Sequence, residues 1–280
     1  MTTVTRAPAP SDERLPSVWP ALGGAAAAAV GLMLGLLLGG AAYQTPETGL
    51  PDPGPVVGWG LPIATALTVI AGTITLGLLV TAAFLMPGPD RTHVSRAGRR
   101  DVVLAAWSAL VWAASALATI AFTHATVIGE PLHRAMAPAT FFTYAFEIPA
   151  NVAHLVTAIL AIGIAVAAAF TARTSAAAML TGIATIALIA GPLTAHGTDL
   201  GDHSLSLAAG TVHAVAAALW VGGLIAMTRH ALLRDPGLSV AIGRFSVLAT
   251  AAVIVLAASG VANTYTRLEQ FGELFTTPYG

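Results

Sequence analysis

Three histidine residues lie within eighteen positions of this sequence, at His196, His203 and His213. His213 falls inside a strongly hydrophobic segment that continues into Trp220-Val-Gly-Gly. An ionisable side chain inside a membrane span is costly, so it usually has a partner or a function. Imidazole is also the commonest metal ligand in proteins. The spacing therefore favours a metal site at one face of a membrane protein.

The remaining ligand types narrow the choice of metal. The chain has no cysteine, which excludes disulfides, thiolate metal sites and thiol catalysis. Its six methionines are scattered singly along the sequence. Thioether sulfur suits soft metals, whereas imidazole also suits borderline ones such as Cu(II). A metal site in this chain would therefore be built mainly from histidine.

The composition is that of a membrane protein. Of 280 residues, 56% are hydrophobic and 9% are charged, and the mean hydropathy is +0.80. A soluble domain carries about 25% charged residues, so this chain has too few charges to cover a surface exposed to water. We expect the lipid bilayer to surround most of the chain, and we expect no nucleic-acid partner.

Seven apolar stretches are long enough to cross a bilayer, for which roughly 20 residues are needed. They lie at about 19–43, 59–86, 102–123, 151–172, 175–195, 205–228 and 245–265. The sequence therefore predicts an all-α fold, a polytopic transmembrane helix bundle. We divide it into a polar tail (1–18), three spans with a long outer loop (19–150), and a core of four spans (151–280).

The arginines predict the orientation of these spans. All twelve basic residues are arginine, and an N-terminus in the cytoplasm places ten of them inside and two outside. The two outer ones are Arg134 and Arg267. The cytoplasmic ones are Arg6, Arg14, Arg91, Arg96, Arg99, Arg100, Arg173, Arg229, Arg234 and Arg244. We therefore expect a multi-pass protein of the cytoplasmic membrane with its N-terminus inside.

The two ends of the chain carry further expectations. The first apolar stretch is about twice as long as the hydrophobic core of a signal peptide, so we expect a retained helix. The sequence stops soon after the seventh span, with no charged tail. We expect it to be the N-terminal part of a longer protein.

With this orientation, six of the eight histidines fall at or near the outer face, and four of them could share a site. The candidate metal ligands are His154, His196, His203 and His213. The fifth and sixth spans are joined by about nine residues and should be antiparallel neighbours, which favours a pairing of His196 with His213. For each histidine a purely structural hydrogen bond to a neighbouring helix stays open as the alternative. His93 and His230 lie among cytoplasmic arginines, and we assign them no role.

Polar and small residues accompany the candidate ligands. His213 and Trp220 share one helical face, and Gly222 and Gly223 follow directly. Ser259 and Asn263, one helical turn apart, lie at a similar outer depth on the seventh span. We name Trp220, Gly222, Gly223, Ser259 and Asn263 as supporting residues of the predicted site.

These stretches resemble a known family, the CopD-type copper resistance and copper transport proteins of bacterial inner membranes. The similarity rests on Ala195-His-Gly, His213-x6-Trp-Val-Gly-Gly, Arg244-Phe-Ser and Ser259-Gly-Val-Ala-Asn263, and covers about residues 190–280. Before residue 150 the resemblance is only general. Similar proteins of high-GC Gram-positive bacteria carry a second membrane domain like the cytochrome oxidase assembly factor CtaG, so a fused or associated CtaG-like domain is expected.

The resemblance implies copper uptake or handling across the cytoplasmic membrane, with His196 and His213 as the first copper ligands. A periplasmic or extracytoplasmic carrier would deliver the copper ion. One alternative is a haem-binding subunit like cytochrome b, with His154 and His213 as ligands. Another is an assembly factor that holds copper for cytochrome c oxidase. The sequence contains none of the phosphate-binding loop, H-E-x-x-H or G-x-S-x-G motifs, and we expect no enzymatic activity.

Overall fold

The computed structural model describes residues 51–90, 92–194 and 203–265, with a few further positions between residues 31 and 43. The contacts divide the chain into two units, 1–42 and 43–280, and the bundle described below belongs to the second. The predicted first span, 19–43, lies almost wholly outside the described residues.

Six long helices form the bundle, and each is long and apolar enough to cross a membrane. They are α2 (Pro55–Val80, continued by a π-helical turn at Thr81–Leu85), α3 (Arg96–Ile128), α6 (Pro149–Phe170), α7 (Thr174–Thr194), α8 (His203–Leu233) and α9 (Leu238–Tyr265). The connection from α3 to α6 contains the short helices α4 (Leu132–Ala135) and α5 (Pro138–Tyr144) and a 3₁₀ turn at Ala145–Glu147. The described residues contain no strand, and the predicted all-α bundle is confirmed.

Three helices, α3, α8 and α9, extend well beyond the spans that hydropathy predicts. The third span, expected at 102–123, is a helix from Arg96 to Ile128. Local capping explains the added turns. The hydroxyl of Ser95 accepts a hydrogen bond from the Gly98 amide at the start, and Gly129 ends the helix with a left-handed φ of 69°. Hydropathy marks only the part in hydrocarbon, whereas caps decide where a helix ends.

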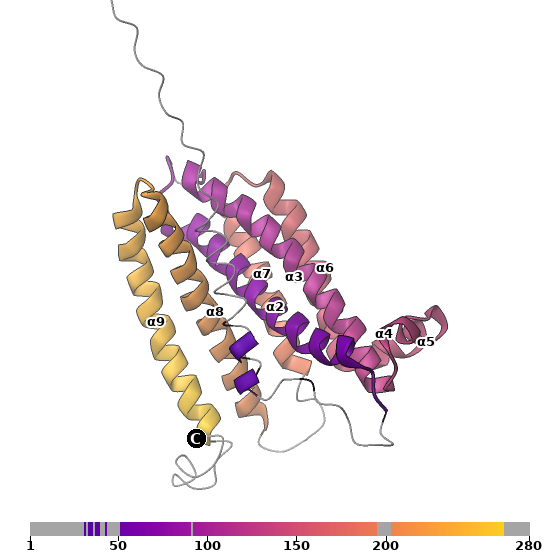
Figure 1. The fold of residues 1–280 in the computed structure, drawn as a ribbon. Helices are drawn as coiled ribbons and strands as arrows, with labels where there is room; N and C mark the ends of the chain where they lie inside the picture. The colour runs from indigo at the N-terminus through magenta and orange to yellow at the C-terminus, as the bar shows by residue number, and fades with distance from the viewer. Residues whose placement is uncertain are drawn as a thin grey trace, which may run out of the picture. The chain divides into compact units, whose positions relative to one another are not determined.

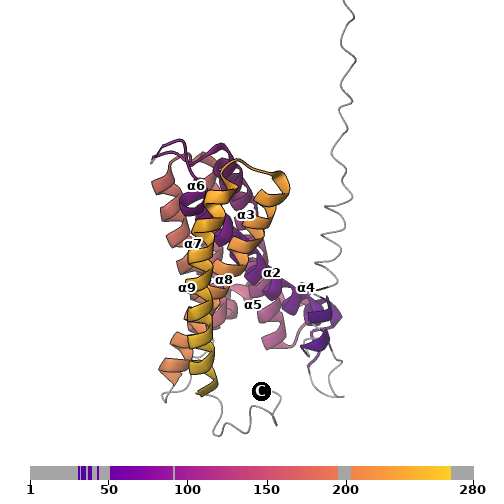
Figure 2. The same ribbon diagram turned by 90° about the vertical axis from the view of Figure 1, so that its left-hand side faces the viewer.

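Successive long helices run in opposite directions, so their turns collect at two ends (Figure 1). The turns around 86–95, 171–173 and 234–237 form what we call the arginine-rich end, at the top of Figure 1. The opposite end, with the start of α8 and the α3–α6 connection, is called the histidine-rich end. α2 packs against α3, α7 and α8, while α6 covers α3 and α9 covers α8 (Figure 2).

Arginines at the arginine-rich end also cap helices. Arg99 donates hydrogen bonds to the carbonyl oxygens of Ala168 and Ala169 at the end of α6, at 3.2 and 2.8 Å. Arg244 donates to the carbonyls of Phe84 and Leu85 beyond α2. Cations are favourable near helix C-termini, where carbonyl groups lack partners. These arginines therefore stabilise helix ends.

Glycines bring α8 very close to α2. A Cβ added at Gly77 of α2 would overlap backbone atoms of Gly222, and one added at Gly222 would overlap the carbonyl of Thr73. Gly223 faces the other way, where a Cβ would press on the ring of Phe245 in α9. Small residues allow such close backbone approach between membrane helices. The Gly222–Gly223 pair thus fixes α8 between its two neighbours.

Candidate functional site

His213 of α8 has one defined partner, a serine on α9. Its Nδ1 atom lies 3.1 Å from the hydroxyl oxygen of Ser259, and that hydroxyl lies 2.7 Å from the carbonyl oxygen of Val255. A hydroxyl has one proton, and donating it to the carbonyl leaves the oxygen free to accept from Nδ1–H. When the hydroxyl donates its proton in this way, a neutral imidazole carries its own proton on Nδ1 and the lone pair of Nε2 is available. Metal-ligating histidines have this arrangement, with one nitrogen held by a neighbour.

The face that carries His213 points away from the bundle core. His213 is exposed, Trp220 is 37% exposed and Leu224 is 48% exposed, while Ser259 is buried. His213, Trp220 and Leu224 thus share an exposed face of α8. Within the described residues, α8 packs against its neighbours mainly through its other faces. Trp220 is left partly exposed, and the glycines that follow it provide the close contacts with α2 and α9.

Of the predicted site residues, two are described only in their backbone and one is not described at all. His196 lies outside the described residues. His203 begins α8, and Asn263 lies in the last turns of α9, but only their backbone is described. Ten residues of continuous helix separate His203 from His213, which corresponds to about 15 Å along the axis. His203 thus lies nearly three turns closer to the start of α8 than His213 does.

His154 is not joined to His213. It lies on α6, which packs against α3 and α7, whereas His213 faces α9 from α8. No hydrogen bond connects the two among the described residues, and the Nδ1 atom of His154 is buried without a partner there. No group of three His, Asp or Glu side chains able to hold a metal occurs within the described ranges. The haem alternative, which paired His154 with His213, gains no support.

His124 is a buried histidine whose role the sequence did not reveal. The predicted third span stops at residue 123, yet His124 lies in the last turns of α3 with 0% exposure. Neither ring nitrogen has a hydrogen-bond partner in the described part of the chain, and the ring packs edge-on against Phe141 at 5.4 Å. The helix extends past the apolar stretch and the α3–α6 connection folds over it, which hydropathy alone does not indicate.

The α3–α6 connection brings an imidazole and a thioether to one pocket. His133 and Met136, three residues apart, line a pocket of about 580 Å³ together with Pro53, Pro131 and Leu132. Both side chains are exposed. The pocket lies at the histidine-rich end and is mostly apolar apart from the imidazole.

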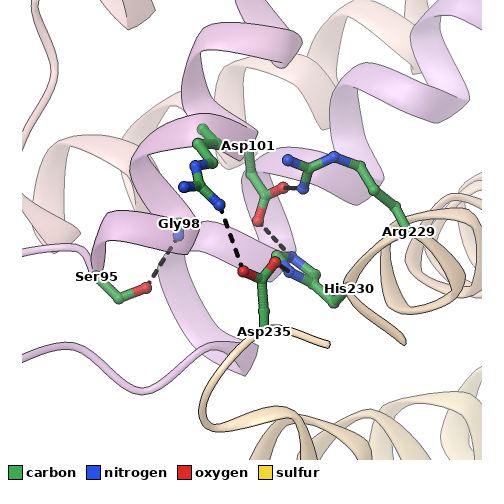
Figure 3. Close-up of polar contacts among 7 residues, drawn as sticks. Ser95, Gly98, Asp101, Arg229, His230 and Asp235 are labelled. Carbon is green, nitrogen blue, oxygen red and sulfur yellow. Dashed lines mark hydrogen bonds and ion pairs between the residues drawn. The ribbon is translucent and has the colours of Figure 1, made fainter. Parts of the chain in front are cut away.

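The tightest polar cluster lies at the arginine-rich end, where the sequence predicted no site (Figure 3). The Nε2 atom of His230 is 2.7 Å from Oδ2 of Asp101, and its Nδ1 atom is 2.8 Å from Oδ2 of Asp235. His230 and Asp101 are fully buried, and Asp235 is 8% exposed. The cluster connects α3, α8 and the turn between α8 and α9.

Two arginines complete this cluster. Arg229 donates to Oδ1 of Asp101 at 2.5 Å, and Arg100 lies 3.5 Å from Oδ1 of Asp235. A sequence signal was present, because Asp101 begins an apolar stretch and Arg229-His230 ends another. His230 was given no role, whereas the structure buries it with Asp101 and Asp235 and leaves Arg100 exposed.

A second Asp–His pair at the same end is exposed. His93 lies 3.0 Å from Asp90 through its Nδ1 atom. Hydrogen bonds from the side chain and amide of Thr92, and then from His93, hold the pKa of Asp90 well below its usual range. This pair orders the turn between α2 and α3. It is an exposed Asp–His contact at the same end as the buried contacts of His230.

Two protein-family models match the chain. "Copper resistance protein D-like, N-terminal domain" matches residues 51–205, and "Copper resistance protein D" matches residues 239–280. The chain belongs to the copper resistance protein D family. The resemblance inferred from the sequence is thereby confirmed, and it extends well before residue 150. Neither the search of curated proteins nor the search of solved structures gave a match.

The two matched stretches frame the features described above. The N-terminal copper resistance protein D-like stretch contains Asp101, His124 and His154, and the second stretch contains Ser259. His213, the Gly222–Gly223 pair and His230 lie between them, in residues 206–238. This membrane-spanning member of a copper resistance family thus has a histidine paired with a serine near one end and a buried Asp–His–Asp cluster at the other.

Proposed function

We propose that this protein moves copper ions across the cytoplasmic membrane, and that His213 is its central copper ligand. The observation that carries the proposal is the His213–Ser259 contact, which leaves Nε2 of the imidazole free. Membership of a copper resistance family supplies the identity of the cargo. An imidazole ligand accommodates both Cu(II) and Cu(I) when other imidazoles join it.

The remaining ligands come from the same end of the bundle. We propose His196 as the second ligand, because α7 and α8 are antiparallel neighbours joined by residues 195–202. His203 lies about 15 Å farther out along α8, so it would receive copper from an extracytoplasmic carrier before His213 does. His154 remains a candidate for a third ligand through its unpartnered Nδ1 atom.

The test is the copper content and visible spectrum of purified protein, for wild type, His213→Ala and His93→Ala. His93→Ala is the matched control, because His93 is an exposed histidine at the arginine-rich end. We expect near-stoichiometric copper in wild type and in the control, and its loss in His213→Ala. Uptake of copper into proteoliposomes should be lost in the same variant.

Three outcomes would contradict the proposal. Copper retained in His213→Ala would remove His213 from the site. A Soret band that disappears in this variant would move the protein to the haem class. Copper binding without uptake would favour a protein that only holds copper for oxidase assembly.

A further inference from the structure

The two hydrogen bonds of His230 require one proton more than a neutral imidazole and two ionised carboxylates carry. Both ring nitrogens face a carboxylate oxygen, at 2.7 Å toward Asp101 and 2.8 Å toward Asp235. These are the lengths of charge-assisted hydrogen bonds, and each needs a proton between its two heavy atoms. A neutral imidazole carries only one N–H, and ionised carboxylates carry none. The triad therefore binds one additional proton.

The neighbouring charges place that proton on the imidazole. The second oxygen of Asp101 accepts from Arg229, and the second oxygen of Asp235 faces Arg100. Both partners stabilise the carboxylates as anions. Arg229, whose side chain is 24% exposed, and a protonated His230 balance the charges of Asp101 and Asp235. Without the proton, this group would carry a net negative charge in the bundle, which is costly.

We propose that Asp101, His230 and Asp235 form a proton-binding site whose proton is exchanged during each passage of the copper cargo. Chains of Asp and His inside membrane spans are characteristic of proton relays in pumps and transporters. The proton site itself follows from the hydrogen bonds, whereas its coupling to copper rests on the proposed function.

The proton controls whether the arginine-rich end is held together. With it, His230 bridges α3 to the turn between α8 and α9 (Figure 3). Without it, a neutral imidazole can donate to only one carboxylate, and the other anion loses a donor while still buried. Loss of the proton therefore favours separation of α3 from α8, and it leaves a negative charge that attracts a passing cation.

Other charged groups of the packed elements have partners elsewhere or lie in water. On α3, Arg99 is bound to carbonyls of α6, and on α9, Arg244 is bound to carbonyls beyond α2. Arg234, in the turn after α8, is exposed. The π-helical turn that follows α2 contains no titratable residue. The triad with Arg100 and Arg229 is thus the group on which protonation acts.

Asp101→Asn should keep both hydrogen bonds of His230 while removing the need for the additional proton. The retained Oδ1 can still accept from Arg229, while the new amide can donate to Nε2 of a neutral His230. Both bridges then form without the additional proton, so this end should stay closed at every pH. His230→Gln has the opposite effect, because both N–H groups of the amide lie on one nitrogen, which reaches one carboxylate, while the amide oxygen cannot donate to the other. His93→Gln alters an exposed Asp–His pair and serves as the control.

The first measurement is ¹⁵N NMR of the full chain labelled at histidine, which needs no copper. We expect an imidazole with both nitrogens protonated near neutral pH, and we expect it to disappear in His230→Gln and to become neutral in Asp101→Asn. If the signal lost in His230→Gln belongs to a neutral imidazole, the proton site is overturned.

The second measurement is copper uptake into proteoliposomes over a pH series, with equal pH on both sides. We expect wild-type and His93→Gln uptake to slow several-fold as pH falls. Asp101→Asn should be slow and His230→Gln fast, both without pH dependence. Unchanged pH profiles in these two variants would overturn the coupling. A wild type that moves no copper at any pH would instead overturn the proposed function, and the NMR result would still decide the proton site.

Discussion

At the residue scale, the ability of His213 to bind a metal depends on which ring nitrogen is hydrogen-bonded to Ser259. The sequence placed Ser259 at a similar depth to His213, and the structure puts the two in hydrogen-bond contact. The sequence alone could not assign the proton to Nδ1, because that step needs the bond from Ser259 to the Val255 carbonyl. A residue that orients an imidazole affects metal affinity without touching the metal.

Ser259→Ala tests this orienting role. Loss of a group that holds a ligating histidine typically weakens metal binding 10- to 100-fold, so we expect about that decrease in copper affinity with the stoichiometry retained. A competition titration against a chelator of known affinity measures it. Ser246→Ala is the control, because Ser246 is on the same helix and its hydroxyl bonds only to the carbonyl of Ile242. Equal affinities in the two variants would show that Ser259 does not orient the ligand.

The buried triad, in contrast, could not be predicted from the sequence. His230 and Asp101 are 129 positions apart, and no periodic pattern connects them. Their partnership arises because α3 starts and α8 ends at the same face of the bundle. The topology predicted from the arginines already implied this proximity. What it did not imply is burial, which depends on helix ends that extend beyond the apolar stretches.

At the element scale, α8 is held by two glycines with different surroundings. Gly222 meets backbone atoms of α2, which cannot move aside, whereas Gly223 meets an aromatic side chain of α9, which can rotate. The sequence motif Trp-Val-Gly-Gly was interpreted as support for a metal site. The contacts indicate that its glycines act by fixing the position of the helix that carries His213.

Gly222→Ala should destabilise the bundle because the added methyl group has no space. Overpacking of this kind costs about 1–3 kcal/mol, and more where backbone must shift. Gly243→Ala, on α9, adds the same methyl group where nothing lies within 4 Å, and its effect should be neutral or stabilising by up to about 1 kcal/mol. Thermal unfolding of the detergent-solubilised variants compares them. A Gly222→Ala protein as stable as Gly243→Ala would mean that α2 and α8 are not in close contact.

At the scale of the whole molecule, hydropathy was enough to predict the architecture. Six of the seven predicted spans correspond to long helices in the described residues, since in lipid a backbone must satisfy its own hydrogen bonds and the helix is the simplest solution. The lateral arrangement was not predictable, because lipid-facing and core-facing residues are equally apolar. That is why His154 and His213, similar in depth, could be paired in the sequence and yet stand on helices that face different neighbours.

The orientation of the bundle can be tested directly, since the chain contains no cysteine and a single introduced one is the only thiol. Pro89 lies in the exposed turn after α2, at the arginine-rich end, and Ala137 lies in the exposed connection between α4 and α5. Because arginine-rich segments are retained in the cytoplasm, we expect a membrane-impermeant thiol reagent to label Ala137→Cys in intact cells. Pro89→Cys should be labelled only after the membrane is permeabilised. The reverse pattern would put the His230 triad on the outer side and His213 on the inner side, so that the direction proposed for copper would have to be inverted.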